Sequence, residues 1–99
     1  MKPIVIRYNA KPEGAQQNAD LIEGVFRELE REKPPGVRYL VLRLDDGSFV
    51  HIVAYDGEET GLTTLATFRT FQDEAGEFRA DAPVRREAEI VGNYRMLAK

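Results

Sequence analysis

The sequence predicts a single α+β domain in which a four-stranded antiparallel sheet carries two helices on one face. Three observations predict this fold class. Residues 37–55 have the pattern of a β-hairpin, residues 15–33 have the pattern of an amphipathic helix, and the chain follows the order β-α-β-β-α-β without a linker or an internal repeat. The 99 residues suit one domain, spanning positions 1–99.

The first strand is predicted at residues 3–8. Its side chains alternate between two faces, with Ile4, Ile6 and Tyr8 on one and Val5 and Arg7 on the other. The sequence Lys11-Pro12-Glu13-Gly14 ends this strand, because proline and glycine favour a turn.

A long amphipathic helix is predicted from Ala15 to Lys33. Its apolar residues recur at helical spacing: Ala15, Ala19, Ile22, Val25, Phe26 and Leu29. Arg31 and Lys33 lie in the last turn, where positive charge suits the negative end of the helix dipole. Pro34-Pro35-Gly36 ends the helix.

The hairpin folds around Asp45-Asp46-Gly47, and a three-residue loop with Gly47 in the left-handed conformation is predicted there. Such a loop pairs Leu42 with Val50 and Leu40 with Ile52. One face then carries only apolar residues: Leu40, Leu42, Leu44, Val50, Ile52 and Ala54. A two-residue turn at Asp46-Gly47 would mix polar and apolar residues on both faces, so the three-residue loop is preferred.

A second helix is predicted to begin near Leu65, with Thr63 or Thr64 as its cap. Its aromatic and small residues again recur at helical spacing: Phe68, Phe71, Ala75 and Phe78. Gly76 predicts a kink or break, because glycine weakens a helix by about 1 kcal/mol relative to alanine. Residues 81–83 end the helix, and residues 86–97 are predicted to form the last strand, with a bulge at Gly92.

This element order predicts a ferredoxin-like topology, with the leucine-rich face of the hairpin under the helices. The opposite face would then be uncovered; it carries Tyr39, Val41, Phe49, Val53 and Val5 beside Arg43, His51 and Arg7. Such a patch exceeds the few hundred Å² that a monomer normally exposes. We therefore expect a homodimer through this sheet face, because a two-fold axis lets one surface cover itself.

Composition and charge exclude several classes of function. No cysteine is present, which excludes disulfides, thiolate metal sites and a cysteine nucleophile. With 14 basic and 17 acidic residues interspersed, the net charge of −3 provides no basic stripe for nucleic acid. Arg7 and the pair Arg85-Arg86 are local exceptions, but phosphate binding there is disfavoured because acidic Glu87 and Glu89 lie beside the pair. No apolar run approaches the roughly 20 residues that span a bilayer, so we expect a cytoplasmic protein without membrane contact.

Four features of the layout carry a family resemblance: the turn at residues 11–14, the helix after it, Pro35-Gly36 before the second strand, and the Tyr55-Asp56 step after the third. In these the chain resembles the dimeric α+β-barrel superfamily, and within it the small proteins similar to antibiotic biosynthesis monooxygenases. The resemblance implies a homodimer with a small-molecule pocket. Members include cofactor-free oxygenases of aromatic quinols, haem-degrading oxygenases, isomerases and proteins of unknown role, so the fold does not determine the reaction.

The chain also departs from these relatives. The oxygenases that it resembles commonly have a tryptophan after strand three, whereas this chain has no tryptophan and has Tyr55 there. The haem-degrading branch has an axial histidine on the second helix, and residues 64–80 contain none. Haem degradation is therefore disfavoured, and no cofactor is expected. Asn9, at the end of strand one, lies roughly where that branch has a functional asparagine.

His51 is the only histidine, so one chain cannot form a site with two or three histidines, and no metal is expected. The hairpin register puts His51 on the interface-facing side of the sheet. Two roles remain open for it: a hydrogen-bonded structural residue, or a group that transfers protons.

Several aromatic residues are candidates to line a cavity between sheet and helices: Tyr8, Tyr55, Tyr94, Phe68 and Phe71. Rings suit a flat aromatic substrate by stacking, and a phenol hydroxyl can hold or protonate a substrate oxygen. The alternative is that these rings form the hydrophobic core.

The leading hypothesis is a homodimer that binds a small apolar or aromatic molecule and acts as a cofactor-independent monooxygenase on an aromatic or quinol-like substrate. The candidate catalytic residues are Asn9, His51, Tyr55 and Tyr94, and the candidate pocket residues are Tyr8, Phe68 and Phe71. The alternative is a non-catalytic metabolite-binding or structural, stress-associated module. The sequence contains no phosphate-binding loop, dinucleotide fingerprint or serine-hydrolase motif.

Overall fold

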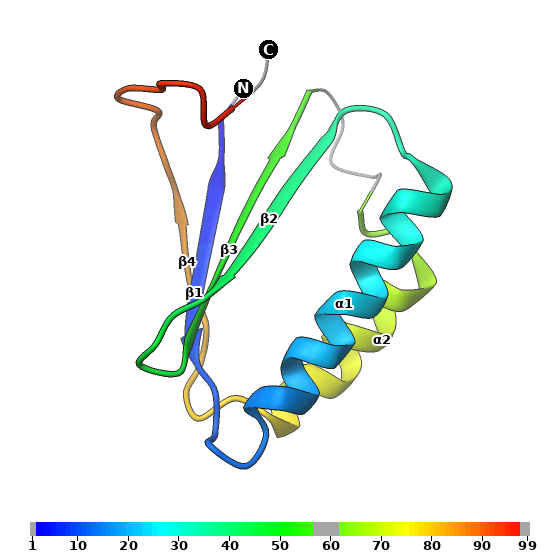
Figure 1. Ribbon diagram of the computed structural model, residues 1–99, viewed down its shortest axis with the longest axis vertical. Helices are drawn as coiled ribbons and strands as arrows, with labels where there is room; N and C mark the ends of the chain where they lie inside the picture. The colour runs from blue at the N-terminus through cyan, green and yellow to red at the C-terminus, as the bar shows by residue number, and fades with distance from the viewer. Residues whose placement is uncertain (1, 57–61, 98–99) are drawn as a thin grey trace.

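The computed structural model describes residues 2–56 and 62–97 and confirms the β-α-β-β-α-β order. The elements are β1 (Ile4–Asn9), α1 (Ala15–Glu32), β2 (Val37–Arg43), β3 (Ser48–Tyr55), α2 (Ala66–Glu74), the short 3₁₀ helix η1 (Ala75–Glu77) and β4 (Val84–Glu87). The four strands form an antiparallel sheet in the order β2-β3-β1-β4. Both α-helices lie on the same side of it (Figure 1), which is the predicted ferredoxin-like arrangement.

The β2–β3 hairpin has the predicted register, in which Leu42 pairs with Val50 and Leu40 with Ile52. The Leu44 N–H donates to the Ser48 carbonyl at 2.8 Å, and the Gly47 N–H donates to the Leu44 carbonyl at 3.1 Å. Gly47 has a φ of +88°, in the left-handed region that glycine adopts without steric cost. The three-residue loop is therefore confirmed.

The helices cover the opposite face of the hairpin from the one predicted. The side chains packed under them are Ile4 and Tyr8 of β1 with Tyr39, Val41, Phe49, His51 and Val53 of the hairpin. Leu40 and Leu42 are each 44% exposed on the other side. We call this side, which the helices leave uncovered, the open face; its apolar residues are Val5, Leu40, Leu42, Val50, Ile52 and Ala54, and Arg7, Arg38 and Arg86 lie on the same side.

Ring packing explains why the helices cover this face. Phe26 of α1 stacks on Tyr39 with the ring centroids 5.0 Å apart, and Tyr8 stacks on Phe49 at 5.8 Å. Both faces of the hairpin carry several large apolar side chains, so their alternation does not decide which face the helices cover. The larger rings fill the space between helix and sheet, and two of them also provide the hydrogen-bond partners that let His51 be buried.

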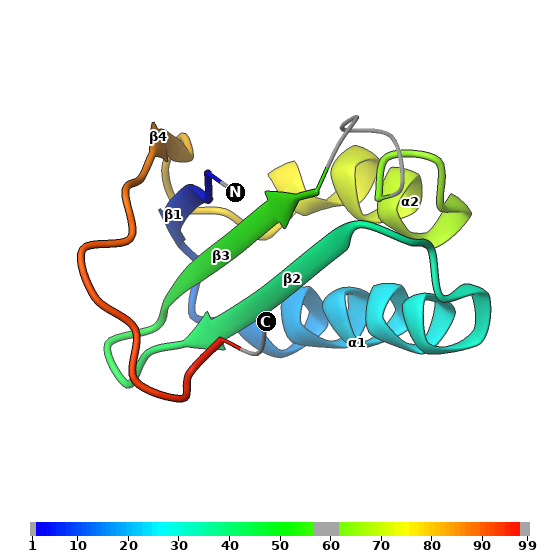
Figure 2. The ribbon, with the colours of Figure 1, turned by 90° about the horizontal axis from the view of Figure 1, so that it is seen from above.

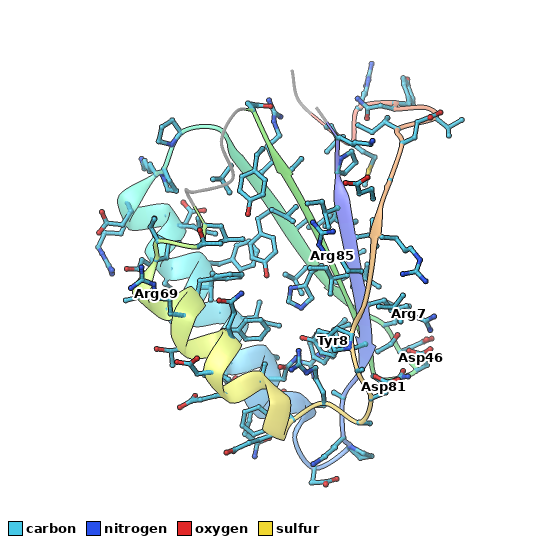
Figure 3. The ribbon with its side chains drawn as sticks, turned by 180° about the vertical axis from the view of Figure 1, so that it is seen from behind. Arg7, Tyr8, Asp46, Arg69, Asp81 and Arg85 are labelled. Carbon is cyan, nitrogen blue, oxygen red and sulfur yellow. The ribbon has the colours of Figure 1, made fainter. Side chains whose placement is uncertain are left out.

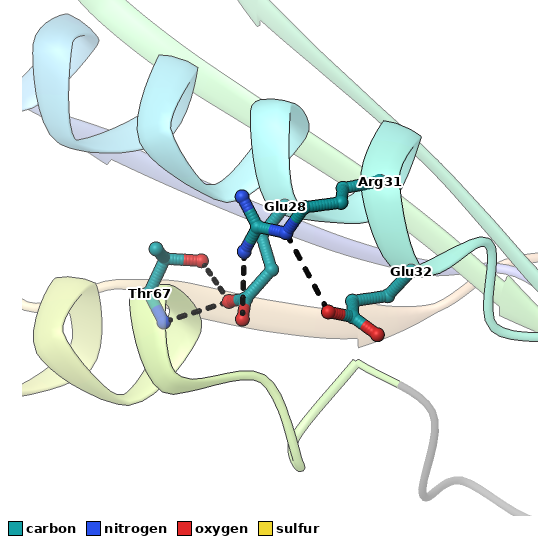
Figure 4. Close-up of polar contacts among 4 residues, drawn as sticks. All are labelled: Glu28, Arg31, Glu32 and Thr67. Atoms are coloured by element: carbon teal, nitrogen blue, oxygen red, sulfur yellow. Dashed lines mark hydrogen bonds and ion pairs between the residues drawn. The ribbon is translucent and has the colours of Figure 1, made fainter.

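The start of α2 is capped from the neighbouring helix, and the predicted capping role of Thr63 or Thr64 is wrong. Leu65 occupies the cap position and makes no side-chain cap bond. A carboxylate oxygen of Glu28, on α1, instead accepts hydrogen bonds from the Thr67 N–H at 3.0 Å and the Thr67 hydroxyl at 2.6 Å (Figure 4). This contact joins the C-terminal part of α1 to the first turn of α2.

The end of the chain departs from the prediction after α2. The α-helix gives way at Ala75 to the 3₁₀ turn that contains Gly76, where a break was expected. β4 covers only Val84–Glu87, so the prediction of a last strand over residues 86–97 is wrong for most of its length. Residues 89–97 instead run across the open face towards β2 (Figure 2), where they line a hollow with Leu40 and Ile52.

Candidate functional site

A cavity of about 410 Å³ lies between the sheet and α2. Much of its wall is apolar: Ile4, Ile6, Val53, Leu62, Phe68, Phe71, Ala75 and Pro83. Its polar lining consists of Tyr8, Tyr39, His51, Tyr55, Thr63, Gln72, Arg79 and Arg85. An apolar cavity with a few convergent polar groups is the usual form of a small-molecule site.

Four residues form a polar chain, which consists of the buried Asn18, Tyr8 and His51 and the half-buried Tyr39. The Asn18 amide nitrogen donates to the Tyr8 hydroxyl at 2.9 Å, and that hydroxyl lies 2.9 Å from Nε2 of His51. Nδ1 of His51 lies 2.6 Å from the Tyr39 hydroxyl. His51 is only 4% exposed, so its predicted position on an uncovered interface is wrong. Both ring nitrogens of His51 have a phenol as partner, which compensates its burial.

The imidazole in this chain is neutral near pH 7. Burial, with a smaller contribution from the positive charge of Arg79, lowers the pKa of His51 to about 4. Burial raises the pKa of the hydroxyl groups of Tyr39 and Tyr8, so both phenols keep their protons. A neutral imidazole has one N–H donor and one nitrogen acceptor. One phenol therefore donates to His51 and the other accepts from it.

Donation along the polar chain is possible in two directions. If the Asn18 amide nitrogen donates to Tyr8, then Tyr8 donates to Nε2 of His51, Nδ1–H donates to Tyr39, and the Tyr39 proton is left for an acceptor in the cavity. In that direction the buried oxygen of Asn18 has no partner among the described residues. Rotation of the amide would turn this oxygen towards Tyr8 and reverse the chain. The Tyr39 oxygen then becomes an acceptor.

Arg79 and Arg85 place positive charge on the lining of the cavity. The guanidinium carbon of Arg79 lies 5.8 Å from the centre of the Tyr8 ring. Arg85 pairs with Ile6 in the β1–β4 register, so its side chain leaves the sheet on the helix side, as does Tyr8 (Figure 3). None of the described residues that line the cavity is acidic.

Five of the residues proposed from the sequence lie around this cavity: Tyr8, His51, Tyr55, Phe68 and Phe71. They come from β1, β3 and α2. His51 and Phe71 are stacked with their ring centroids 5.6 Å apart, and Phe71 and Phe68 lie 6.2 Å apart. The fold thus brings together aromatic residues as far apart in the chain as Tyr8 and Phe71, which are separated by 63 positions.

The structure places Asn9 and Tyr94 away from the cavity. Asn9 is exposed, and its backbone N–H and amide nitrogen donate to the carboxylate of Asp81 at 2.8 and 2.7 Å. Tyr94 is 80% exposed and lies in the segment that crosses the open face. The expectation that Tyr94 lines the space between sheet and helices is wrong, because the last strand ends before it.

Asn18, Tyr39 and Arg79 belong to this site although the sequence alone did not indicate them as site residues. A signal for Asn18 was present: it is a polar residue inside the apolar stripe of α1, between Ala15 and Ile22. Tyr39 was recognised on the same hairpin face as His51 but was assigned to an interface. No local pattern marks Arg79. The pair Arg85-Arg86 marks a local positive charge, but only the packing of β4 shows that Arg85, and not Arg86, faces the cavity.

Other parts of the described structure contain fewer groups that could bind a ligand or take part in a reaction. A hollow of about 520 Å³ beside α1 has a charged rim of both signs, formed by Glu23, Arg27, Glu30 and Arg43. Within residues 2–56 and 62–97, no three His, Cys, Asp or Glu side chains are grouped as a metal ion would require. In the same part of the chain, no helix combines the length and the apolar character needed to cross a membrane.

Comparison with known proteins finds likeness in structure alone. No family model and no curated protein matches the sequence. A candidate antibiotic biosynthesis monooxygenase from Nitrosomonas europaea matches with a TM-score of 0.77 and 16% identity, over 93% of this chain and 100% of that one. Another from Caulobacter crescentus CB15 matches with a TM-score of 0.72 and 18% identity, over 92% of this chain and 90% of that one.

A protein of unknown function from Nitrosomonas europaea matches as well, with a TM-score of 0.71 and 15% identity, over 98% of this chain and 95% of that one. Such low identities show the fold, and a shared fold is compatible with different reactions. The predicted resemblance is confirmed at this level: the chain has the ferredoxin-like fold of the antibiotic biosynthesis monooxygenase-like proteins.

Proposed function

We propose that the cavity binds a small aromatic molecule and that the protein acts on it as a cofactor-independent monooxygenase of quinol-like substrates. The observation that carries this proposal is the polar chain that ends at Tyr39 in a cavity walled by aromatic rings. The names of the solved proteins with the same fold support the reaction class.

The cavity suits a flat molecule with an oxygen substituent. Its volume of about 410 Å³ falls within the usual range of ligand pockets. Phe68 and Phe71 offer ring surfaces for stacking, and the Tyr39 hydroxyl offers a hydrogen bond. The buried side chains at the base of the cavity, Tyr8, His51 and Phe71, would keep water from the part of a substrate that contacts them, which strengthens polar contacts there.

The polar chain provides a route for the substrate proton. As the Tyr39 oxygen accepts that proton, the proton of Tyr39 passes to Nδ1 of His51, 2.6 Å away. The His51 N–H at Nε2 then donates to Tyr8, and Tyr8 donates to the rotated amide of Asn18. The pKa of His51 is low in the empty cavity, but a substrate anion beside it would stabilise the imidazolium.

The substrate anion supplies the electrons for the oxygenation. For a reacting CH₂ group, loss of a proton gives a carbanion, whose electron pair forms a C–O bond to dioxygen. Return of the proton gives a hydroperoxide. Loss of water from it leaves a carbonyl, so one oxygen atom enters the product and the other leaves as water. The protein orients the substrate and moves the proton.

The test is dioxygen uptake by the purified, metal-free protein with hydroquinones, anthrone-like phenols and flavonoids, beside protein-free controls. Uptake that depends on protein concentration is expected for at least one compound class. Thermal denaturation of the protein with each compound reports binding separately. Compounds that raise the melting temperature without any protein-dependent uptake would contradict the monooxygenase and favour a non-catalytic binding module.

We also propose that the protein is a homodimer whose interface is the open face. Leu40 and Leu42 are each 44% exposed there. Further along the chain, Val91, Tyr94 and Met96 are 92%, 80% and 81% exposed. A monomer rarely leaves a contiguous apolar surface of this kind uncovered, and a two-fold axis would let the open face cover itself.

A further inference from the structure

We propose that the cavity holds its ligand as an anion, with Arg79 and Arg85 binding a negatively charged oxygen on an otherwise aromatic body. The ligand class is then aromatic carboxylates and acidic phenols. This inference rests on the proposed ligand-binding role of the cavity and adds the charge of the ligand to it.

The first argument is the charge of the cavity lining. Arg79 and Arg85 both line the cavity, while its described wall includes neither Asp nor Glu. The protein as a whole has 17 acidic against 14 basic residues and a net charge of −3. The excess of positive charge at the cavity therefore does not follow from the overall composition. Positive charge without an acidic neighbour on the described lining favours an anion, more strongly at the half-buried Arg79 than at the exposed Arg85.

The second argument is that these arginines are not neutralised from within the described part of the chain. Neither Arg79 nor Arg85 forms an ion pair with a described acidic residue. The acidic residue nearest in sequence to Arg85 on β4 is Glu87, and its carboxylate lies 3.7 Å from the Lys2 ammonium. Arg79, which is half-buried, has the Tyr8 ring face as its contact. A ligand anion would provide the counter-charge that both arginines lack among the described residues.

The third argument is geometric. Arg79 follows η1, where it also forms a backbone bridge with Ala10, whereas Arg85 lies on β4 opposite Ile6. The two guanidinium groups thus come from different segments and converge on the lining of one cavity. A guanidinium can form two parallel hydrogen bonds with a carboxylate, and it can also hold a phenolate oxygen. Phe68 and Phe71 remain available for the aromatic body.

Arg86 provides a matched control on the same strand. It pairs with Val5, so its side chain leaves the sheet on the open face. Its Nη1 donates to the Arg85 carbonyl at 2.8 Å. Arg86→Gln removes the same charge as Arg85→Gln from the adjacent position, but it does not change the cavity.

The test measures binding by titration calorimetry, with 2-naphthoate and its neutral analogue 2-naphthamide as probes. The wild-type protein is expected to bind 2-naphthoate about tenfold more tightly than 2-naphthamide. Arg79→Gln and Arg85→Gln are each expected to reduce that preference while leaving 2-naphthamide binding unchanged. Arg86→Gln is expected to keep the preference. Arg79→Lys, which retains the charge, is expected to keep most of it.

A second arm distinguishes phenols from carboxylates by using 4-nitrophenol, whose phenolate absorbs visible light. Binding to the wild-type protein is expected to lower the pH at which the probe ionises, and Arg79→Gln is expected to reverse that shift. If the protein prefers 2-naphthoate but does not change the pH at which 4-nitrophenol ionises, the site binds carboxylates. A shift without a preference for 2-naphthoate assigns it to phenols. Either result supports an anion site.

Two results would overturn the inference. In the first, the wild-type protein neither prefers 2-naphthoate nor changes the pH at which 4-nitrophenol ionises. In the second, both effects persist in the Arg79→Gln, Arg85→Gln double variant. Binding of 2-naphthamide in that case would leave the aromatic cavity intact as a ligand site. Failure of every probe to bind would overturn the ligand site and this inference together. Dioxygen uptake plays no part in the test, so failure of the proposed reaction remains a separate result.

Discussion

The Tyr39 hydroxyl lies 2.6 Å from Nδ1 of His51, and this contact joins β2 to β3 inside the cavity. Tyr39 pairs with Val53 and His51 pairs with Val41 in the hairpin register, so Tyr39 and His51 are diagonal neighbours on one face. The hairpin therefore provides two of the four residues of the polar chain. Tyr8 and Asn18 add the other half, from β1 and α1.

Removing the Tyr39 hydroxyl tests the role of the polar chain in turnover. Tyr39→Phe keeps the ring that stacks on Phe26 but removes the only atom of Tyr39 that can exchange a proton with a substrate. We expect turnover, measured as dioxygen uptake, to fall about 100-fold. Urea denaturation should show a loss of about 1 kcal/mol. Tyr94→Phe, at a position 80% exposed, is the control and should leave uptake unchanged. Equal uptake by both variants would exclude the Tyr39 hydroxyl from the reaction.

The burial of His51 predicts that stability falls in mild acid. The pKa of His51 is about 4 in the folded protein and near 6.5 when unfolded, so between these values the unfolded chain binds more protons. Stability from this group is fully present above pH 6.5 and is lost as the pH falls towards 4, by roughly 3 kcal/mol in total. Urea unfolding at several pH values should show a steeper loss for the wild-type protein than for His51→Gln. Equal slopes would mean that His51 titrates normally.

The contact between Glu28 and Thr67 predicts that α2 depends on α1 for its cap. Hydrogen bonds from the Thr67 hydroxyl and N–H lower the pKa of Glu28. Glu28→Gln should therefore lower the melting temperature above pH 5, where the carboxylate is charged, and the difference should shrink as acid protonates Glu28. Glu32→Gln is the control, because Glu32 contacts Arg31 at 3.5 Å on the surface. A larger loss in Glu32→Gln than in Glu28→Gln would contradict the capping role.

The open face predicts the effect of a charge on assembly. Leu42→Asp places a carboxylate in the proposed interface, where an unpaired charge is costly. We expect light scattering to show a dimer for the wild-type protein and a folded monomer for this variant. Gln17→Asp adds a charge at an exposed position of α1, on the other side of the sheet, and should keep the dimer mass. A wild-type monomer, or a Leu42→Asp dimer, would exclude the open face as the interface.

The element order and the hairpin register follow from the amino-acid sequence. Both depend on interactions between residues close in the chain: the helical spacing of Ile22, Val25 and Leu29, and the loop geometry that Gly47 allows. The break near Gly76 was also predictable, because its cause is the local backbone. The sequence also indicated which aromatic residues could line a cavity, but it did not indicate how they are arranged.

Which face of the hairpin the helices cover, and therefore where the site lies, depends on contacts between residues far apart in the chain. Either face is apolar enough to be buried, so the choice depends on how Phe26 and Phe71 fit against Tyr39 and His51. Burial of His51 became possible because Tyr8, 43 positions away, satisfies one ring nitrogen and Tyr39 the other. Local patterns do not encode such long-range pairing, and for that reason the polar chain appears only in the folded protein.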